Sequence, residues 1–255
     1  MSFFLAPQAK LKWLETPSVY HLVRDELYEL DQESFRFLSA CAAPEGCPSR
    51  DSAFTDFCLE EGLLTREPVL VKRAQPSVPS PDPSLRYLEL QITNRCNLRC
   101  RHCYIGDVVP RDLPATQVRS VLRQFEELQG LRVLITGGEP VLHGRFDEIN
   151  EMLPDFAFRS VLFSNGLGLH GEVLKKLKVH EIQVSIDGLE RAHDDLRGAG
   201  SWKSSMDALR RALDAGFDVS VSTMISARNL LDFDALEDLF RSHGVREWSV
   251  DVPCL

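Results

Sequence analysis

The sequence of 255 residues lacks three features that would each define a class of protein. No run approaches the roughly 18 apolar residues that cross a membrane. The apolar N-terminus is short, and Lys10 and Lys12 follow it rather than precede it, which is the wrong order for a secretory signal. The formal net charge is −9, so nothing marks a general binder of nucleic-acid phosphates. These absences predict a cytoplasmic protein with neither a membrane nor a nucleic acid as partner.

A disulfide framework is also missing, because the seven cysteines are an odd number and no secretory signal accompanies them. The wide spacing of Cys41, Cys47 and Cys58 favours unligated thiols over a compact metal loop. A zinc or cluster site completed by a partner stays open for them. A second group, Cys96, Cys100 and Cys103, falls within eight residues and needs its own explanation.

The chain divides at residues 76–84, where four prolines stand among nine residues. Proline sustains neither a helix nor a central strand, so this segment is typical of a stiff linker. The linker separates residues 1–75 from residues 85–255.

Residues 85–255 alternate short β-branched runs with helical patterns. We expect five helices between six strands, which begin near Tyr87, Arg132, Ser160, Glu181, Asp218 and Glu247. This order implies right-handed βαβ units and a parallel sheet, and therefore an α/β fold. A complete or partial (β/α) barrel is favoured over an open doubly wound sheet, although the pattern alone does not separate the two.

Polar and glycine-rich residues follow the first four strands, where ligands gather in parallel sheets. The first of these segments carries Cys96, Cys100 and Cys103, and thiolates so spaced can surround one soft metal centre. Structural zinc requires four protein ligands, and no fourth cysteine lies nearby; His102 would have to fold back toward the metal. A four-iron cluster with three cysteines keeps one iron for another ligand. The loop therefore predicts an iron–sulfur cluster ahead of zinc.

Three motifs at these strand ends resemble those of the radical S-adenosylmethionine (SAM) superfamily. They are Cys96-x-x-x-Cys100-x-x-Cys103-Tyr104, Gly137-Gly138-Glu139-Pro140 and Ser185-Ile186-Asp187-Gly188. The resemblance implies that the three cysteines hold a [4Fe–4S] cluster and that SAM is cleaved there to a 5′-deoxyadenosyl radical, which abstracts hydrogen from the substrate. It also implies an oxygen-sensitive enzyme supplied by an electron donor such as flavodoxin or ferredoxin.

The resemblance further implies which residues bind SAM. Tyr104 would flank the adenine, and Ser185 and Asp187 would bind the ribose and methionyl region. Arg197 would pair with the SAM carboxylate through a charge-assisted hydrogen bond.

Gly137, Gly138 and Glu139 would hold the SAM amino group, the glycines letting the backbone approach the ligand. Each motif has a plain alternative, because Gly-Gly and Asp-Gly occur in ordinary turns and a single arginine is usually solvated. Asn165-Gly166, after the third strand, is interpreted first as a turn and second as a contact to SAM or to the cysteine loop.

The sequence near Pro253 and Cys254 resembles the junction at which many members enter a SPASM or twitch extension that bears auxiliary clusters. An uncovered edge is costly for a hydrophobic parallel strand. We therefore expect a partial (β/α)6 barrel, either truncated before an auxiliary-cluster region or completed by a partner chain; the alternative is an open barrel edge. Cys254 would be a buried thiol or the first ligand of such a region.

Residues 1–75 predict a small α+β domain. Residues 18–23 and 26–30 alternate like paired strands, and helices are expected through Phe37 and Phe57, before an ending at residues 61–65 and 69–71. This part resembles the winged-helix domains of the PqqD type, which bind leader peptides by adding them to a sheet edge. The alternative is a structural cap on the barrel.

Together these features predict a radical SAM enzyme that modifies a peptide or small protein during ribosomal-peptide maturation. A sulfatase-maturase-like protein oxidase and a maturase of a small-molecule cofactor are rival activities. A catalytically inactive peptide-binding module is the non-enzymatic alternative, and the intact cysteines and glycines argue against it.

Overall fold

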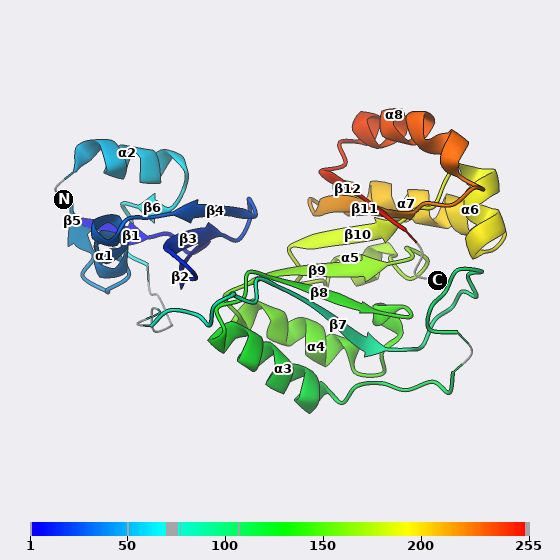
Figure 1. The fold of residues 1–255 in the computed structure, drawn as a ribbon, viewed down its shortest axis with the longest axis horizontal. Helices are drawn as coiled ribbons and strands as arrows, with labels where there is room; N and C mark the ends of the chain where they lie inside the picture. Colours follow the sequence, from blue (N-terminus) through cyan, green and yellow to red (C-terminus); the bar gives the residue numbers. More distant parts are fainter. Residues whose placement is uncertain (1, 50, 70–75, 77, 107, 253–255) are drawn as a thin grey trace. The chain divides into compact units, whose positions relative to one another are not determined.

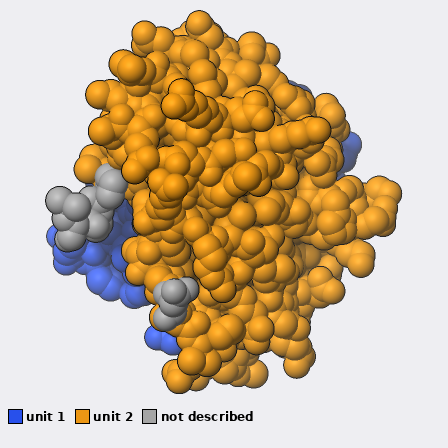
Figure 2. All heavy atoms as spheres, turned by 90° about the vertical axis from the view of Figure 1, so that its right-hand side faces the viewer, with its two compact units in different colours: residues 1–88, 122–132, 156–159 blue, residues 89–121, 133–155, 160–255 orange. Residues whose placement is uncertain are grey.

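The computed structural model describes residues 2–49, 51–69, 76, 78–106 and 108–252. It contains two compact units, coloured separately in Figure 2. Unit 1 comprises residues 1–88, 122–132 and 156–159, and unit 2 comprises residues 89–121, 133–155 and 160–255. None of the helices in the described ranges is both long enough and apolar enough to cross a membrane.

Unit 1 begins with two small sheets and two helices (Figure 1). The antiparallel sheet β2-β3-β4 consists of Ala9–Trp13, Pro17–His21 and Glu26–Glu29. The antiparallel sheet β5-β1-β6 consists of Cys47–Pro48, Ser2–Leu5 and Leu64–Thr65. The helices are α1 (Gln32–Cys41) and α2 (Ser52–Glu60). Each begins after an aspartate, Asp31 or Asp51, whose side chain accepts a backbone N–H of the first turn.

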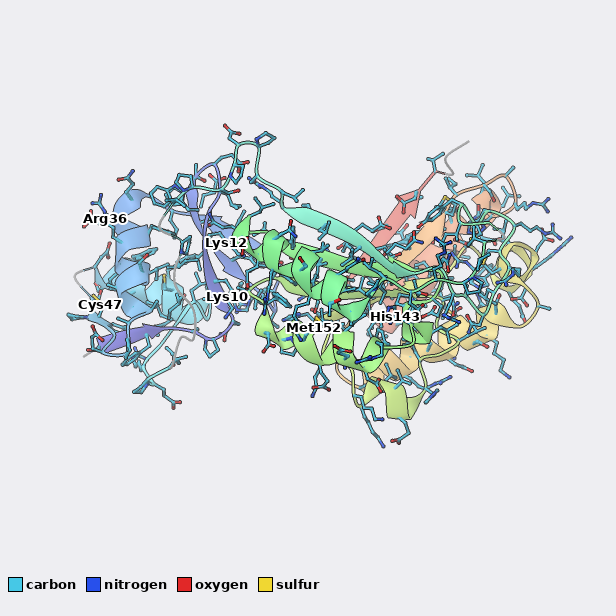
Figure 3. All side chains as sticks on the ribbon, turned by 90° about the horizontal axis from the view of Figure 1, so that it is seen from below. Lys10, Lys12, Arg36, Cys47, His143 and Met152 are labelled. Atoms are coloured by element: carbon cyan, nitrogen blue, oxygen red, sulfur yellow. The ribbon has the colours of Figure 1, made fainter. Side chains whose placement is uncertain are left out.

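The expected strand pair and both expected helices of residues 1–75 are confirmed by β3, β4, α1 and α2. The sequence patterns did not indicate β1 and β2. In β2 the reason is Lys12 (labelled in Figure 3), which is 3% exposed. Its ammonium donates to Gly130 O (2.7 Å) and Ala157 O (2.8 Å), and these bonds compensate the burial of the charge. Of the expected run at 69–71, residues 70 and 71 lie outside the described residues.

The three N-terminal cysteines belong to the apolar core of unit 1. Cys41 and Cys58 are buried in it, and Cys47 of β5 packs against it partly exposed (Figure 3). Burial raises the pKa of the Cys41 and Cys58 thiols to about 12, so both are uncharged at neutral pH. These two side chains pack as small apolar groups.

The described part of the proline-rich segment, Pro76 and residues 78–84, forms neither helix nor strand. It is nevertheless tied down inside unit 1. The Ser80 N–H donates to Trp13 O (2.7 Å), and the Gln129 side chain donates to Val78 O (3.0 Å). The proposed domain boundaries at residues 75 and 85 stay a prediction.

The main sheet has six strands in chain order, from β7 to β12. They are β7 (Tyr87–Thr93), β8 (Arg132–Gly137), β9 (Arg159–Ser164), β10 (Glu181–Ser185), β11 (Asp218–Met224) and β12 (Glu247–Asp251). Strands β9 to β12 pair in parallel. The outer strands β7 and β12 are not paired with each other, so the sheet is a partial barrel. The expected α/β class and all six strands are confirmed.

Helices connect the strands, as expected for βαβ units. They are α3 (Ala115–Glu127), α4 (Phe146–Met152), α5 (Gly171–Leu174), α6 (Glu190–Arg197), α7 (Ser201–Asp214) and α8 (Phe233–His243). The prediction of five helices is wrong for the described chain, because the connection from β10 to β11 contains two. Gly198 (φ 120°) and Gly200 (φ 77°) adopt backbone angles that end α6 before α7 begins.

Burial in the sheet explains why the strands were recognisable. Almost every residue of β9 and β10 is buried, as in a parallel sheet covered by helices. The amphipathic α7 supplies part of that cover through Met206 and Leu209, which are 1% and 0% exposed. The polar segments lie at the carboxyl ends of the strands, directly after β7, β8, β9 and β10.

Candidate active site

The cysteine loop, residues 94–104, follows β7 and is fastened at both ends. Near its start, the Thr93 hydroxyl donates to the Asp112 carboxylate (2.7 Å), and the Asn94 amide donates to Val109 O (3.0 Å). Near its end, the Arg101 N–H donates to Leu196 O in α6 (2.8 Å). The loop is therefore held between residues 109–112 and α6.

The three thiols of this loop lie close enough to influence one another's ionisation. Cys96 and Cys100 are partly buried, whereas Cys103 is exposed. Burial raises the pKa of Cys96 and Cys100, and the other thiols of the loop raise it further. The Arg197 guanidinium acts in the opposite direction on Cys100. An arginine thus stands beside the loop, where it favours the thiolate form that a metal requires.

This set of donors fits a cluster better than a single ion. Across the residues that the structure describes, no group of three or more His, Cys, Asp or Glu side chains is arranged to hold one metal ion. In a four-iron cluster each cysteine ligates a different iron, so three thiols need not converge on one point. His102, the alternative fourth ligand, is engaged elsewhere: its Nε2 lies 3.3 Å from Asp187 Oδ2.

Gly137 and Gly138, at the end of β8, lie against the cysteine loop. A Cβ on Gly137 would stand 2.5 Å from Thr93 O, and one on Gly138 would stand 2.3 Å from Arg95 O. The same backbones are hydrogen-bonded, with Gly138 N–H donating to Thr93 O (2.9 Å) and Glu139 N–H donating to Arg95 O (2.7 Å). The close approach that requires glycine is therefore made with the loop's own backbone, in addition to any approach to a ligand.

Glu139 is fully buried between the ends of β8 and β9. Its carboxylate accepts hydrogen bonds from the Ser164 hydroxyl (2.9 Å) and the Asn165 N–H (2.8 Å). Burial raises the pKa of Glu139 to about 7, and these hydrogen bonds together with Arg197 limit the rise. A cationic group placed beside Glu139 would lower this pKa and be attracted to the resulting carboxylate.

Asn165 contacts the cysteine loop directly. Its side-chain amide donates to Asn97 Oδ1 (2.8 Å) and lies 3.8 Å from the Cys96 sulfur. The second interpretation of Asn165-Gly166, a contact to the cysteine loop, is therefore confirmed. The first is also supported, since Gly166 has φ 87°.

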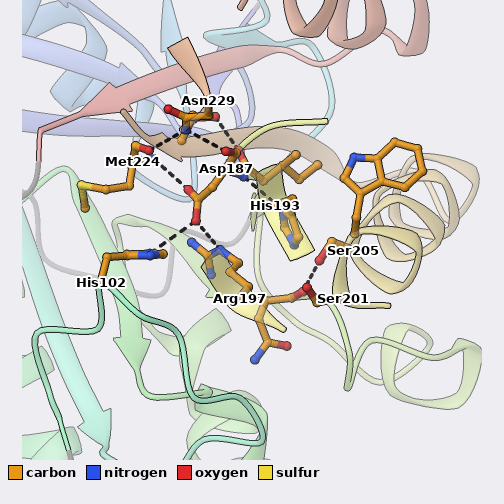
Figure 4. A network of polar contacts seen from close by, with 12 residues as sticks. His102, Asp187, His193, Arg197, Ser201, Ser205, Met224 and Asn229 are labelled. Atoms are coloured by element: carbon orange, nitrogen blue, oxygen red, sulfur yellow. Dashed lines mark hydrogen bonds and ion pairs between the residues drawn. The ribbon is translucent and has the colours of Figure 1, made fainter. Parts of the chain in front are cut away.

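Asp187, just after β10, is the centre of a buried polar network (Figure 4). Its Oδ2 accepts from Arg197 Nε (2.5 Å) and lies 3.3 Å from His102 Nε2, while its Oδ1 accepts from the Met224 N–H (2.8 Å). Burial alone would raise the pKa of Asp187, but the Arg197 guanidinium and these hydrogen bonds hold it below its usual value. Asp187 is therefore a carboxylate at neutral pH.

Two fully buried side chains hold the Asp187 backbone in turn. His193 Nδ1 accepts from the Asp187 N–H (3.1 Å), and the Asn229 amide donates to Asp187 O (2.7 Å) and Met224 O (2.8 Å). Burial, with a further contribution from Arg197, lowers the pKa of His193 to about 4, so its ring is neutral. Figure 4 shows both residues beside Asp187.

The structure places the remaining predicted residues less centrally. Tyr104 is 74% exposed, and its hydroxyl is 3.4 Å from Gln91 Oε1. Ser185 ends β10, opposite Ser222 of β11, two residues before Asp187. The roles that the resemblance gives to all these residues stay proposals.

Sequence reasoning considered His102 only as a fourth metal ligand, and it missed His193 and Asn229 as parts of the site. The structure places the His102 imidazole against Asp187, with Nε2 3.3 Å from Asp187 Oδ2, rather than at a metal. The other two carry no motif signal. His193 and Asn229 matter through hydrogen bonds to main-chain atoms of distant segments, which only the folded chain displays.

Comparisons with known proteins agree with this geometry. Residues 90–240 match the Radical SAM superfamily. The chain belongs to this superfamily, whose members use a [4Fe–4S] cluster and SAM.

The curated relatives align with only part of this chain. The AdoMet-dependent heme synthase of Nitratidesulfovibrio vulgaris is 26% identical over 176 residues, which are 66% of this chain and 48% of that protein. The sporulation killing factor maturation protein SkfB of Bacillus subtilis is 34% identical over 146 residues, 55% of this chain and 36% of SkfB. The chain thus spans less than half the length of these two curated relatives.

A solved structure extends the likeness of fold to 99% of the chain. Streptococcus suis SuiB bound to the precursor peptide SuiA superposes with a TM-score of 0.72 at 15% identity, covering 99% of this chain and 63% of SuiB. At this identity the superposition shows a shared fold, including the N-terminal elements.

Proposed function

We propose that the chain is the SAM-cleaving part of an enzyme that modifies a ribosomally made peptide, and that its N-terminal elements bind the leader of that peptide. The observation that carries this proposal is the SuiB fold, which matches 99% of the chain, N-terminal elements included, in a structure that holds a precursor peptide. SkfB, a maturation protein by name, adds a sequence relative of the same kind.

In this proposal the cysteine loop holds the cluster through Cys96, Cys100 and Cys103. When bound, the cluster and SAM supply a radical that abstracts hydrogen. Arg197 offers its guanidinium to the SAM carboxylate, and buried Glu139 attracts the SAM amino group. Glu139 and Asp187 are 0% exposed, so these two carboxylates are shielded from water.

Several finer predictions belong to the same proposal. Tyr104 and Ser185 are assigned to the adenine and the ribose region. The electron donor would be a flavodoxin or ferredoxin. A SPASM or twitch region with auxiliary clusters would complete the enzyme, on this protein or on a partner chain. Cys254, its candidate first ligand, lies outside the described residues.

The leader peptide requires an open sheet edge, and β4 provides one. Among the described residues β4 pairs with β3 alone, whereas the outer edge of β2 is covered. There the Trp13 N–H donates to Gln129 Oε1 (2.6 Å), and Trp13 O accepts from the Ser80 N–H (2.7 Å). A peptide added along β4 would bind through main-chain hydrogen bonds.

SAM cleavage is tested by anaerobic reconstitution with iron and sulfide, followed by dithionite and SAM. We expect 5′-deoxyadenosine, detected by liquid chromatography and mass spectrometry, and we expect none from Cys100→Ala. Absence of 5′-deoxyadenosine from protein with a full iron content would refute radical SAM activity.

Leader binding is tested at Glu29, whose N–H points away from β3. The next residue, Leu30, donates its N–H to Pro17 O (2.8 Å), and neighbouring strand residues alternate in direction. Glu29→Pro should therefore weaken binding of precursor peptides encoded beside the gene at least tenfold in fluorescence anisotropy. Glu29→Ala, which keeps the N–H, should bind like the parent. Equal binding by all three proteins would exclude the β4 edge.

The heme synthase likeness favours a second candidate, maturation of a small-molecule cofactor. The two candidates differ in the response to peptide. A peptide-modifying enzyme forms more 5′-deoxyadenosine when its precursor peptide is added, and the peptide changes mass. With a cofactor maturase, added precursor peptide raises neither the yield of 5′-deoxyadenosine nor its own mass.

A further inference from the structure

Beside the open edge of β4 lies an exposed aromatic side chain of α2. Tyr28 of β4 and Phe57 of α2 pack edge to face, with ring centroids 5.9 Å apart. Phe57 is nonetheless 41% exposed. A single exposed apolar side chain is ordinary, but this one stands next to a strand whose outer edge is unpaired among the described residues. A peptide that pairs with β4 would therefore cover apolar surface as well as form main-chain hydrogen bonds.

Two carboxylates meet at the Tyr28 hydroxyl on the same face of β4. Residues two apart in a strand share a face, so Glu26 lies on the face of Tyr28. The Tyr28 hydroxyl is 2.5 Å from Glu26 Oε2 and 2.9 Å from Glu61 Oε2, at the end of α2. Burial, and next these two carboxylates, raise the pKa of Tyr28. A phenol donates one hydrogen, whereas each carboxylate accepts several, so the pair keeps capacity for a cationic donor.

Cationic side chains are scarce around this pair of carboxylates. Residues 26–61, from β4 to the end of α2, contain nine acidic side chains and two basic ones, Arg36 and Arg50. Arg24, just before β4, pairs with Glu61. This part of unit 1 therefore carries an excess of negative charge, which attracts a cationic peptide and repels an acidic one.

Strand pairing converts these contacts into a sequence pattern. On one face of a sheet, side chains directly opposite each other in adjacent strands have Cβ atoms about 4.5–5.5 Å apart. The side chain opposite Tyr28 in an added strand would thus lie against the Phe57 ring. The next side chain on that face, two residues away, would lie opposite Glu26 and near Glu61. The complementary peptide has a large apolar residue at the first position and lysine or arginine at the second.

We propose that the leader segment bound along β4 is cationic and contains a large apolar residue two positions from a lysine or arginine, in either order. Phe57 packs on the apolar residue, and Glu26 and Glu61 bind the cation. The proposal rests on the proposed leader binding and adds the chemistry of the peptide that is bound. Main-chain hydrogen bonds give affinity for any extended peptide, and these three side chains give preference among peptides.

The test uses four fluorescein-labelled peptides of serine and threonine that differ only at their centres. A central Lys-Thr-Leu-Thr-Lys serves both strand directions, and the matched centres are Lys-Thr-Ala-Thr-Lys, Gln-Thr-Leu-Thr-Gln and Glu-Thr-Leu-Thr-Glu. In fluorescence anisotropy with the parent protein, replacement of leucine should weaken binding about tenfold. Replacement of lysine by glutamine should weaken it about threefold, and by glutamate more. Equal binding by all four peptides would overturn the proposal.

Matched protein variants assign each preference to its side chain. Phe57→Ala should remove the difference between the leucine and alanine peptides, and Phe57→Leu should restore part of it. The double variant Glu26→Gln/Glu61→Gln should remove the difference between the lysine and glutamine peptides. Glu45→Gln is the control, because Glu45 is an exposed carboxylate between α1 and β5, and it should bind all four peptides like the parent. Differences that survive in variants with a cooperative thermal melt would contradict the assignment.

Failure of this inference and failure of the proposed function have different signatures. If precursor peptides encoded beside the gene bind the parent, and the lysine–leucine peptide binds no better than its controls, leader binding stands and the preference is refuted. If neither the precursors nor the four peptides bind, the proposed leader binding fails and the inference falls with it. Salt gives an independent readout, since it should weaken binding of the lysine peptide more than that of the glutamine peptide.

Discussion

Unit 1 and unit 2 each contain an aspartate that faces two basic side chains, and the two sites differ in what they hold. In unit 1, Asp25 accepts from the Tyr20 hydroxyl and from Arg132 (3.1 Å), and Arg159 Nε lies 3.9 Å away. Arg159 also donates to Leu22 O (2.8 Å) and Val23 O (2.9 Å). The Asp25 network therefore joins buried side chains to the main chain at Leu22 and Val23.

The Asp187 network keeps capacity for a ligand. Within the described part of the chain, His102 Nδ1 and His193 Nε2 are buried there without a hydrogen-bond partner, and Arg197 is partly exposed. This network lies at the carboxyl end of β10, where parallel sheets bind ligands. The comparison teaches that a buried ion pair alone does not mark a site. A ligand site is indicated by the position of the ion pair at the carboxyl end of the sheet and by nearby polar groups that have no partner in the described chain.

The largest expected effect is a loss of unfolding free energy when the Asp25 network is disrupted. Arg159→Met removes a fully buried cation and leaves Asp25 and two carbonyls short of a partner. We expect the free energy of unfolding to fall by about 3–5 kcal/mol in urea denaturation. The affinity for SAM of the folded, reconstituted protein should not change. A parallel loss of SAM affinity would break the comparison.

A smaller effect is expected in the pH dependence of the Asp187 network. The pKa of His193 is about 4 in the folded protein and near 6.5 when unfolded, so the unfolded chain binds the extra proton first on acidification. The stability that neutral His193 provides is full above pH 6.5 and is lost as the pH falls toward 4, up to about 3 kcal/mol.

His193→Asn tests this slope by urea denaturation of cluster-free protein between pH 4 and 7. Glu139 contributes in the opposite direction, because its raised pKa of about 7 makes the fold lose stability as the pH rises from 4.5. That contribution is common to both proteins, so their difference isolates His193. Identical slopes in the parent and the variant would show that His193 does not titrate as described.

The smallest effect is expected at Asp195, which also has two arginine partners but is exposed. It lies 3.0 Å from Arg101 and 2.5 Å from Arg228, and all three side chains are at least one-third exposed. Asp195→Asn should cost less than about 1 kcal/mol of unfolding free energy, and less still in high salt. A loss comparable to that of Arg159→Met would mean that partner count, rather than burial, governs these networks.

Much of the fold of unit 2 was predictable because its signals are local. The β-branched runs marked all six strands, and the motifs marked their carboxyl ends. The connection between β10 and β11 was taken as one helix. It contains two, because the backbone angles of Gly198 and Gly200 separate α6 from α7. In unit 1, β1 and β2 were missed because Ser2–Leu5 is short and unpatterned and because Lys12 is buried by distant carbonyls.

The sequence patterns marked candidate residues of the site, and they did not indicate the contacts between those residues. The spacing of the cysteines indicated a soft metal centre, but no sequence pattern says that Asp187 and Arg197 bind each other. Such a contact depends on side-chain direction at the end of β10 and of α6. Gly138 shows the same limit: the motif marked the position, and the structure supplied the neighbour, Arg95 O.

The hydrogen bond from the Arg101 N–H to Leu196 O links the cysteine loop to the last turn of α6, one residue before Arg197. Whatever orders the loop therefore also orders the helix end that presents the arginine. Thermodynamic linkage makes such a coupling reciprocal: cluster assembly should tighten SAM binding, and SAM should slow cluster loss by the corresponding free energy. The Arg101 amide is a natural reporter, since its hydrogen exchange would slow at both steps.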